Sequence, residues 1–300
     1  MTADEYLRAV LDSQALEDDS DEIKALQKHR ADVEKLIRDN FKDTALTIRY
    51  AGSRAKGTMN KESYDLDIIS YVSSGDNTGG ETLEDIYENH KKALSKKYYV
   101  EPKGSALRLK GRDPEDLGVD FHIDVVPGRF TDETQTDAYL YQSGGDKKRL
   151  KTNLDIHLDR VRDSGLIDAI RVAKLWSVRN GLPIRTFVLE LAVIKLLTDK
   201  KEKSLSAQME HFWTELRDNS ADLTVEDPAN PTGNDLSKCL DDNLKSQLAA
   251  AAKRTLEQIG SSGWEAVFGK TKEEEKAARV EVLRRAAAVA TPSRPWLPKA

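Results

Sequence analysis

The chain has 300 residues, of which 33% are charged, and its formal net charge at pH 7 is −5. This length suits one large or two modest domains, no run of about 18 apolar residues is present to span a membrane, and the acidic balance argues against a long nucleic-acid track. The N-terminus, MTADEYLRAV, lacks the layout of a signal peptide, and Cys239 is the single cysteine, which excludes an intrachain disulfide. We therefore expect a cytoplasmic protein without membrane association.

Two helices are predicted before the first strand. Residues 4–17 form a short amphipathic pattern, and the apolar residues of 21–39 fall near one stripe of a longer helix. Asp19 or Ser20 is the expected N-cap of the second helix. An apolar run over 45–51 then predicts a strand.

The first candidate binding residues follow this strand directly. The run ends in Gly52-Ser53, where a glycine lets the backbone approach a ligand closely. The Ser53 hydroxyl and the free N–H groups of a following helical turn would receive phosphate oxygens. Lys56 adds a cation nearby. These residues predict a nucleotide-phosphate site.

Two carboxylates come about a dozen residues later, spaced as in a strand. Asp65 and Asp67 flank Leu66 at the start of a predicted strand over 66–72, so both project to one face. Carboxylates this close repel each other, and a divalent cation such as Mg²⁺ or Mn²⁺ would neutralise both. A phosphate cradle opposite a metal-holding aspartate pair is what phosphoryl or nucleotidyl transfer needs.

The combination of Gly-Ser after a strand and D-L-D-I on the next strand resembles the signature of the polymerase-β-like nucleotidyltransferase superfamily. That family has a third carboxylate on a later strand, and the alternating segment 119–126 offers one. Asp124, in I-D-V-V-P, looks like the family's residue, and Asp120, on the same face four residues earlier, is the alternative. We interpret His122 as a strand residue beside the site, since the expected metal prefers oxygen ligands.

The segment between these motifs predicts the rest of a mixed sheet with helices packed on it. A helix is expected over 82–97 and strands over 98–101 and 106–110. Basic residues recur from Lys91 to Arg112, which we interpret as a solvated face balanced by acidic neighbours. The alternative is a patch for polyanions; no DNA or RNA activator is evident from the sequence.

Beyond about residue 131 helical patterns dominate. We expect a catalytic domain over 1–150 that includes the N-terminal helices, a helical domain over 151–290 and a mobile Pro-rich tail over 291–300. The elements predicted in this part are a strand at 139–141, a strand-like run from Leu223, and helices at 167–180, 186–198, 206–220, 236–260 and 262–289.

Three C-terminal segments narrow the resemblance. They are R-x-x-K-x-W at 171–176, F-V-L-E-L at 187–191 and E-D-P-A-N-P-T-G-N-D at 226–235, and they are similar to the oligoadenylate-synthetase and cyclic-GMP–AMP-synthase branch. The chain looks most like the bacterial cGAS/DncV-like nucleotidyltransferases (CD-NTases). This resemblance implies an α+β fold in which a polymerase-β-like core and a C-terminal helical domain form two lobes with the active-site cleft between them.

The resemblance also implies a mechanism. Asp65, Asp67 and Asp124 would be catalytic and would bind two Mg²⁺ (or Mn²⁺), while Gly52 and Ser53 would hold the donor triphosphate. Lys174 looks like the family's phosphate-binding lysine, and the alternative is an exposed lysine on an amphipathic helix.

The implied product is a cyclic di- or trinucleotide second messenger, made from NTPs (ATP and/or GTP) in anti-phage (CBASS) signalling. Its expected partners are the NTP substrates, accessory proteins that act on the C-terminus, and an effector reached through the product. Two alternatives stay open: a polymerase-β-type enzyme acting on RNA or protein, and a catalytically inactive binding module. Base choice, ring size, linkage, oligomeric state and activating signal are not encoded in any pattern that we can identify.

Overall fold

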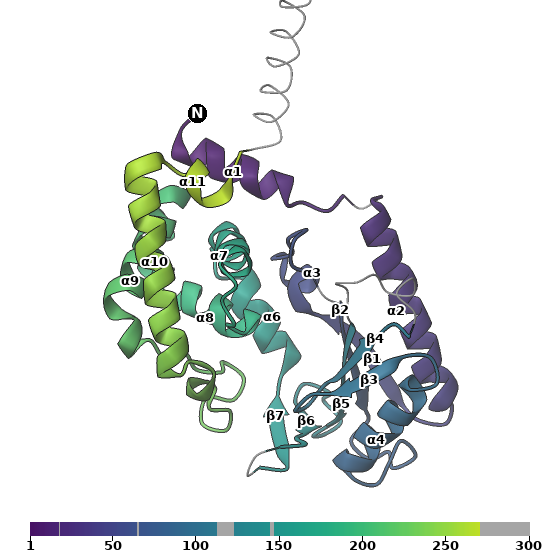
Figure 1. The fold of residues 1–300 in the computed structure, drawn as a ribbon. Helices are drawn as coiled ribbons and strands as arrows, with labels where there is room; N and C mark the ends of the chain where they lie inside the picture. Colours follow the sequence, from purple (N-terminus) through teal and green to yellow (C-terminus); the bar gives the residue numbers. More distant parts are fainter. Residues whose placement is uncertain (18, 65, 113–122, 145–146, 271–300) are drawn as a thin grey trace, which may run out of the picture.

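The computed structural model describes residues 1–300 apart from 18, 65, 113–122, 145–146 and 271–300. The predicted catalytic Asp65, its family's alternative third carboxylate Asp120, the strand residue His122, most of the helix predicted over 262–289 and the predicted tail therefore lie outside the described residues. Figure 1 shows two lobes, a sheet flanked by helices and a bundle of helices, with α1 (Ala3–Ser13) across one end of the bundle.

One lobe is built on a mixed sheet, as the sequence predicts. Its main path runs in the order β1-β2-β5-β4-β3, and β5 also pairs with β6, which pairs with β7. The central strands β2 and β5 are parallel, and the other pairs are antiparallel. The strands are β1 (Leu46–Ala51), β2 (Leu66–Val72), β3 (Tyr99–Pro102), β4 (Leu107–Lys110), β5 (Ile123–Phe130), β6 (Ala138–Tyr141) and β7 (Arg149–Thr152).

Two helices, α2 (Asp21–Asn40) and α4 (Leu83–Leu94), cover one face of this sheet. Ser20, one of the two predicted residues, caps α2, and a capping box of Thr82 and Asp85 starts α4. The core between helices and sheet contains Val33, Ile37, Leu94, Ile68, Leu107, Leu109, Ile123 and Val125. Because side chains alternate along a strand, these apolar residues turn their polar neighbours on β2, β4 and β5 to the opposite face.

The second lobe is helical. Trp176, Phe212 and Trp213 are completely buried at its centre. Its elements are α6 (Leu154–Arg162), α7 (Ile167–Arg179), α8 (Thr186–Leu197), η1 (Thr198–Lys200), α9 (Leu205–Asn219), η2 (Ser220–Asp222), η3 (Leu236–Cys239), α10 (Asp242–Ser262) and α11 (Glu265–Phe268).

Several elements differ from the sequence-based expectation. Buried residues of α1 (Tyr6, Leu7, Val10, Leu11) belong to the core of the helical lobe rather than to that of the sheet. The strand β7 and the helix α6 were not predicted, and residues 223–227, predicted as strand-like, form no strand. The division at residue 150 remains a prediction about domains.

Candidate active site

The turn after β1 brings two of the predicted site residues into contact. β1 ends at Ala51, and the one-turn helix α3 (Gly52–Lys56) begins with the next residue. Gly52 has φ +80°, and a Cβ at this position would lie 2.0 Å from Oδ2 of Asp67. The backbone of the turn is thus held directly against the carboxylate on β2. Only glycine fits both the left-handed conformation and the space.

Asp67 and Asp124 lie side by side on the two central strands. They are direct partners in the parallel register of β2 and β5, so their side chains share the face away from α2 and α4. Ala51 is opposite Asp67 on the other side, which places the end of β1 at the same level. Two of the three predicted metal ligands therefore meet at one point of the sheet; the third, Asp65, is outside the described residues.

A basic side chain that the sequence did not single out joins this site. Arg108, on β4, is the register partner of Asp124, and it donates from Nε to Oδ1 (2.8 Å) and from Nη2 to Oδ2 (2.7 Å). Its interpretation as part of a solvated face is corrected here, since only 29% of the Arg108 side chain and 15% of the Asp124 side chain are exposed. The strictly alternating L-R-L-K of β4 was the available signal, because it puts Arg108 on one face with the leucines on the other.

The donor set fits a magnesium-type ion. Neighbouring carboxylate oxygens on rigid strands are the hard ligands that Mg²⁺ or Mn²⁺ takes, with substrate phosphates completing the coordination. Within the part of the chain that the structure describes, no group of three or more His, Cys, Asp or Glu side chains could hold a metal. Asp67 and Asp124 would thus be two ligands of a site that needs a further one, the position predicted for Asp65.

Lys56, predicted to bind phosphate, turns toward the helical lobe. Its ammonium donates to Oε2 of Glu190 on α8 at 2.7 Å and lies 4.7 Å from the ring centroid of Phe187. Glu190 is completely buried, and its other oxygen accepts from Thr58 Oγ1 at 3.0 Å. This buried ion pair joins the α3 turn to the second lobe.

Lys174 makes a second connection to the same turn. The side chain lies on α7, the residue is 3% exposed, and its ammonium donates to the carbonyl of Thr58 at 2.8 Å. The alternative of an exposed lysine is therefore wrong. Each ammonium carries three N–H donors, so these contacts do not decide whether Lys56 or Lys174 also binds phosphate, and both phosphate contacts remain predictions.

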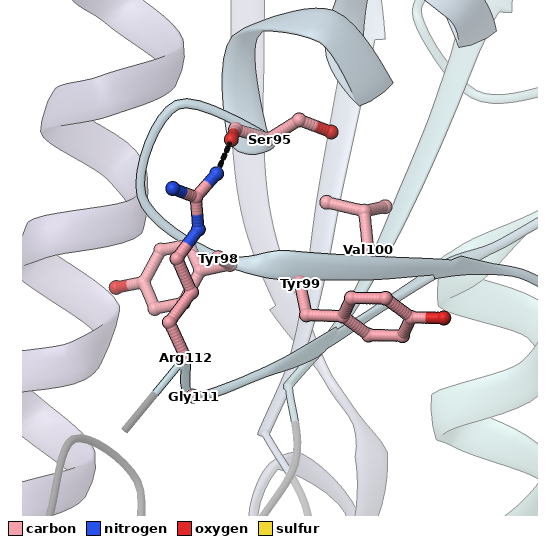
Figure 2. Close-up of a pocket in the computed structure, with 6 residues that line it drawn as sticks. All are labelled: Ser95, Tyr98, Tyr99, Val100, Gly111 and Arg112. Atoms are coloured by element: carbon pink, nitrogen blue, oxygen red, sulfur yellow. Dashed lines mark hydrogen bonds between the residues drawn. The ribbon is translucent and has the colours of Figure 1, made fainter.

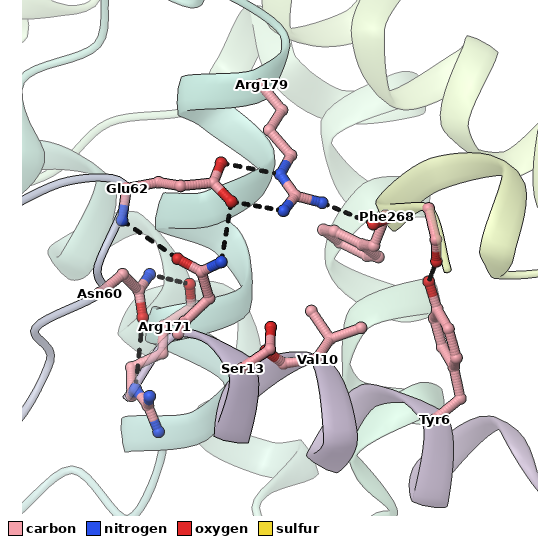
Figure 3. Close-up of polar contacts among 10 residues, drawn as sticks. Tyr6, Val10, Ser13, Asn60, Glu62, Arg171, Arg179 and Phe268 are labelled. Atoms are coloured by element: carbon pink, nitrogen blue, oxygen red, sulfur yellow. Dashed lines mark hydrogen bonds and ion pairs between the residues drawn. The ribbon is translucent and has the colours of Figure 1, made fainter. Parts of the chain in front are cut away.

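The next residues of the motif are tied to α7 and α1 as well, as Figure 3 shows. Asn60 and Arg171 exchange two hydrogen bonds, of 2.8 and 3.3 Å. Glu62 accepts from Arg179 Nε at 3.0 Å and from Gln14 Nε2 at 2.8 Å. The ion pair with Arg179 lowers the pKa of Glu62. The segment that leads from the Gly52 turn to the aspartates is thus anchored on the helical lobe.

The proline-rich segment 226–235 is organised around a buried carboxylate. Asp227 is 1% exposed and accepts hydrogen bonds from Asn234 Nδ2 (2.6 Å) and the Ala229 amide (2.9 Å), while His157 Nε2 on α6 lies 2.7 Å away. Burial by itself raises the pKa of Asp227, but the hydrogen bonds from His157 and Asn234 outweigh it, so the net pKa is lowered. The segment therefore fixes a turn against α6.

A pocket at the far edge of the sheet contains none of the predicted site residues. It lies where α4 leads into the edge strand β3, and Arg112 donates there to the carbonyl of Ser95 (Figure 2). Its lining consists of Ser95, Tyr98, Tyr99, Val100, Gly111 and Arg112.

No protein-family model matches the sequence, and no curated protein does. Solved structures do match. E. coli MS115-1 CdnC with ATP shares 20% identity at a TM-score of 0.63, covering 90% of this chain and 98% of that one. Vibrio cholerae DncV, a cyclic AMP-GMP synthase, shares 19% identity at a TM-score of 0.59, covering 90% of this chain and 85% of that one. Elizabethkingia meningoseptica CdnE, a cyclic dinucleotide synthase solved with GTP and Apcpp, shares 12% identity at a TM-score of 0.59, covering 87% of this chain and 99% of that one. These similarities confirm the α+β fold of the bacterial CD-NTases over most of the chain.

Proposed function

We propose that this protein is a Mg²⁺-dependent nucleotidyltransferase that makes a cyclic di- or trinucleotide from NTPs. The observation that carries the proposal is the meeting of Gly52, Asp67 and Asp124 at one level of the sheet. A backbone turn beside paired carboxylates is the arrangement that nucleotidyl transfer requires. The fold in which it occurs is that of structures described as cyclic dinucleotide synthases.

In this proposal one group of residues binds the metal ions and another binds the donor triphosphate. Asp67 and Asp124, with Asp65, would hold two Mg²⁺ (or Mn²⁺), and Gly52 and Ser53 would place the donor triphosphate beside them. When bound, the ions would supply charge at the attacking ribose hydroxyl and at the departing pyrophosphate. The hydroxyl oxygen forms a bond to the α-phosphorus, the bond to pyrophosphate breaks, and the hydroxyl proton passes to solvent. A last transfer within the linear product, the second for a dinucleotide or the third for a trinucleotide, closes the ring and releases a further pyrophosphate.

The substrates proposed are ATP and/or GTP, since structures with the same fold were solved with these nucleotides. The product would act as a second messenger on an effector in anti-phage (CBASS) signalling, and accessory proteins would act on the C-terminus. One structure with this fold is a complex of E. coli CdnC with a HORMA protein. No helix in the described part of the chain is long and apolar enough to cross a membrane.

The test is a product assay with matched variants. The purified chain is incubated with all four labelled NTPs and Mg²⁺ or Mn²⁺, treated with phosphatase and analysed by mass spectrometry. A phosphatase-resistant product is expected from the wild type and from Asp39→Asn, which neutralises an exposed carboxylate on α2. Asp67→Asn and Asp124→Asn should give none.

The same assay with added cell RNA or lysate separates the alternative acceptors. Label that enters RNA or protein while no cyclic product forms would overturn the synthase proposal in favour of a macromolecular nucleotidyltransferase. Absence of any metal-dependent nucleotide turnover under all of these conditions would favour a binding module.

A further inference from the structure

A row of charged side chains crosses four strands at the level of the candidate site. Asp67 on β2 is in register with Asp124 on β5, which is in register with Arg108 on β4, which is in register with Glu101 on β3. Direct register partners share a face of the sheet, so the four side chains project together. The sign of the charge along the row is therefore negative, negative, positive, negative.

The arginine in this row engages the whole carboxylate of Asp124. Nε reaches one oxygen at 2.8 Å and Nη2 the other at 2.7 Å, the parallel two-point geometry in which guanidinium–carboxylate pairs are strongest. Both side chains are more than two thirds covered, so solvent screens the pair less than an exposed one. A cation that binds Asp124 must share this carboxylate with the guanidinium, whose positive charge opposes the cation.

Glu101, the register partner of Arg108 on β3, forms ion pairs with two lysines. Glu101 is paired with Lys103 and with Lys110, whose ammonium lies 2.7 Å from Oε2. Lys110 is two residues from Arg108 on the same strand and the same face, but it is 54% exposed and contacts Glu101 rather than Asp124. The two cations of β4 thus have separate partners.

We propose that Arg108 is a positioning residue that competes with the divalent cation for Asp124 and so sets the cation concentration that the site requires. This inference rests on the proposed function for the identity of the ion. In the ion-free protein Arg108 places a positive charge against Asp124. When the ion binds, it shares the carboxylate with Arg108, whose hydrogen bonds hold Asp124 in the orientation that the ion uses.

The test measures Mn²⁺ binding directly, without nucleotide and without turnover. Free Mn²⁺ is followed by electron paramagnetic resonance while the full-length chain is titrated, for wild type, Arg108→Gln, Arg108→Lys and the matched control Lys110→Gln. Loss of a charge-assisted pair to Asp124 should tighten Mn²⁺ binding by about tenfold in Arg108→Gln. Arg108→Lys, which retains the charge on a single-point donor, should fall between it and the wild type. Lys110→Gln removes an equal charge from the same strand and should change the affinity less than about twofold.

Wild-type or weaker Mn²⁺ affinity in Arg108→Gln, with Arg108→Lys behaving alike, would overturn the inference and leave Arg108 as a support of the strand. Circular dichroism establishes that each variant is folded, and if Arg108→Gln does not fold, the Mn²⁺ affinity of Arg108→Lys decides the test.

The results distinguish failure of this inference from failure of the proposed function. Tighter Mn²⁺ binding in Arg108→Gln without any cyclic product from the wild type would overturn the synthase function alone. A cyclic product from the wild type, with unchanged Mn²⁺ binding in the Arg108 variants, would overturn only the proposed competition between Arg108 and the cation for Asp124.

Discussion

The carboxylate of Asp67 occupies the space that a side chain at position 52 would need. A Cβ on Gly52 would lie 2.0 Å from Asp67 Oδ2. Position 57, at the other end of α3, differs in this respect: Gly57 has a similar φ of +74°, but no atom lies within 4 Å of its Cβ position. The two glycines therefore separate backbone strain from contact with the candidate catalytic carboxylate.

Gly52→Ala should abolish most activity, and Gly57→Ala should not. Both variants place a side chain in the left-handed region, which should cost about 1 kcal/mol of unfolding free energy, and Gly52→Ala should lose more because its Cβ overlaps the carboxylate of Asp67. Only Gly52→Ala displaces the carboxylate of Asp67, and a displacement of this kind can cost about 100-fold in rate. Product formation and denaturant unfolding of both variants check this. Equal activity in the two would show that the contact at Gly52 has no catalytic meaning.

Glu190→Gln should destabilise the chain by about 3 kcal/mol, because it leaves the Lys56 ammonium, 11% exposed, without its buried counter-charge. The double variant Lys56→Met, Glu190→Gln removes the uncompensated charge, keeps an acceptor for the buried Thr58 hydroxyl and should recover much of the loss. Urea unfolding of wild type, single and double variants measures both effects. Wild-type stability in Glu190→Gln would contradict the importance of this inter-lobe pair.

Asp227→Ala should cost more stability than Asp235→Ala, although both aspartates lie in one proline-rich segment. Asp227→Ala removes the buried acceptor of His157 and Asn234 and should lower the unfolding free energy by about 3 kcal/mol. Asp235→Ala removes an exposed cap of η3 and should lower it by about 1 kcal/mol. Thermal and urea unfolding give the comparison, and equal losses would contradict the buried role of Asp227.

His90 should make the unfolding free energy pH-dependent below neutrality. Nδ1 contacts the carbonyl of Ile86 at 2.8 Å and Nε2 the hydroxyl of Ser70 at 2.9 Å, so the neutral ring, protonated on Nδ1, satisfies both. Burial lowers the pKa of His90 to about 4. Because the folded pKa lies below the unfolded value of about 6.5, the unfolded chain binds more protons in this window. The contribution of His90 to the unfolding free energy is fully present above pH 6.5 and falls by up to about 3 kcal/mol toward pH 4.

Urea unfolding between pH 7 and pH 4 measures this slope. His90→Gln lowers the stability at pH 7 but should lose the part of the slope that comes from His90. An identical slope in the variant and the wild type would show that other groups cause it.

Local patterns predicted the elements that build the site. Alternation predicted that Asp67 and Asp124 each lie on the polar face of their strand, and the register of β2 and β5 then brings them together. Asp19 or Ser20 was expected to cap α2, and Ser20 does. The same patterns missed α6 and β7, where residues 149–162 mix charged and apolar residues without a clean period. They indicated that α1 is buried but not that it packs in the helical lobe, because an apolar stripe does not specify its partner.

The sequence by itself determined the chemistry of this protein: a glycine turn after one strand, carboxylates at strand spacing on the next, and a later strand that carries Asp124. Only the tertiary structure decided which charges meet. Arg108 pairs with Asp124 across two strands, and Lys56 pairs with Glu190 across 134 residues of chain. The spacing of apolar residues indicates the face on which a side chain lies, because that face depends on neighbours along the chain. The choice among many cations and anions depends on how sheet and helices pack, and no local pattern contains that information.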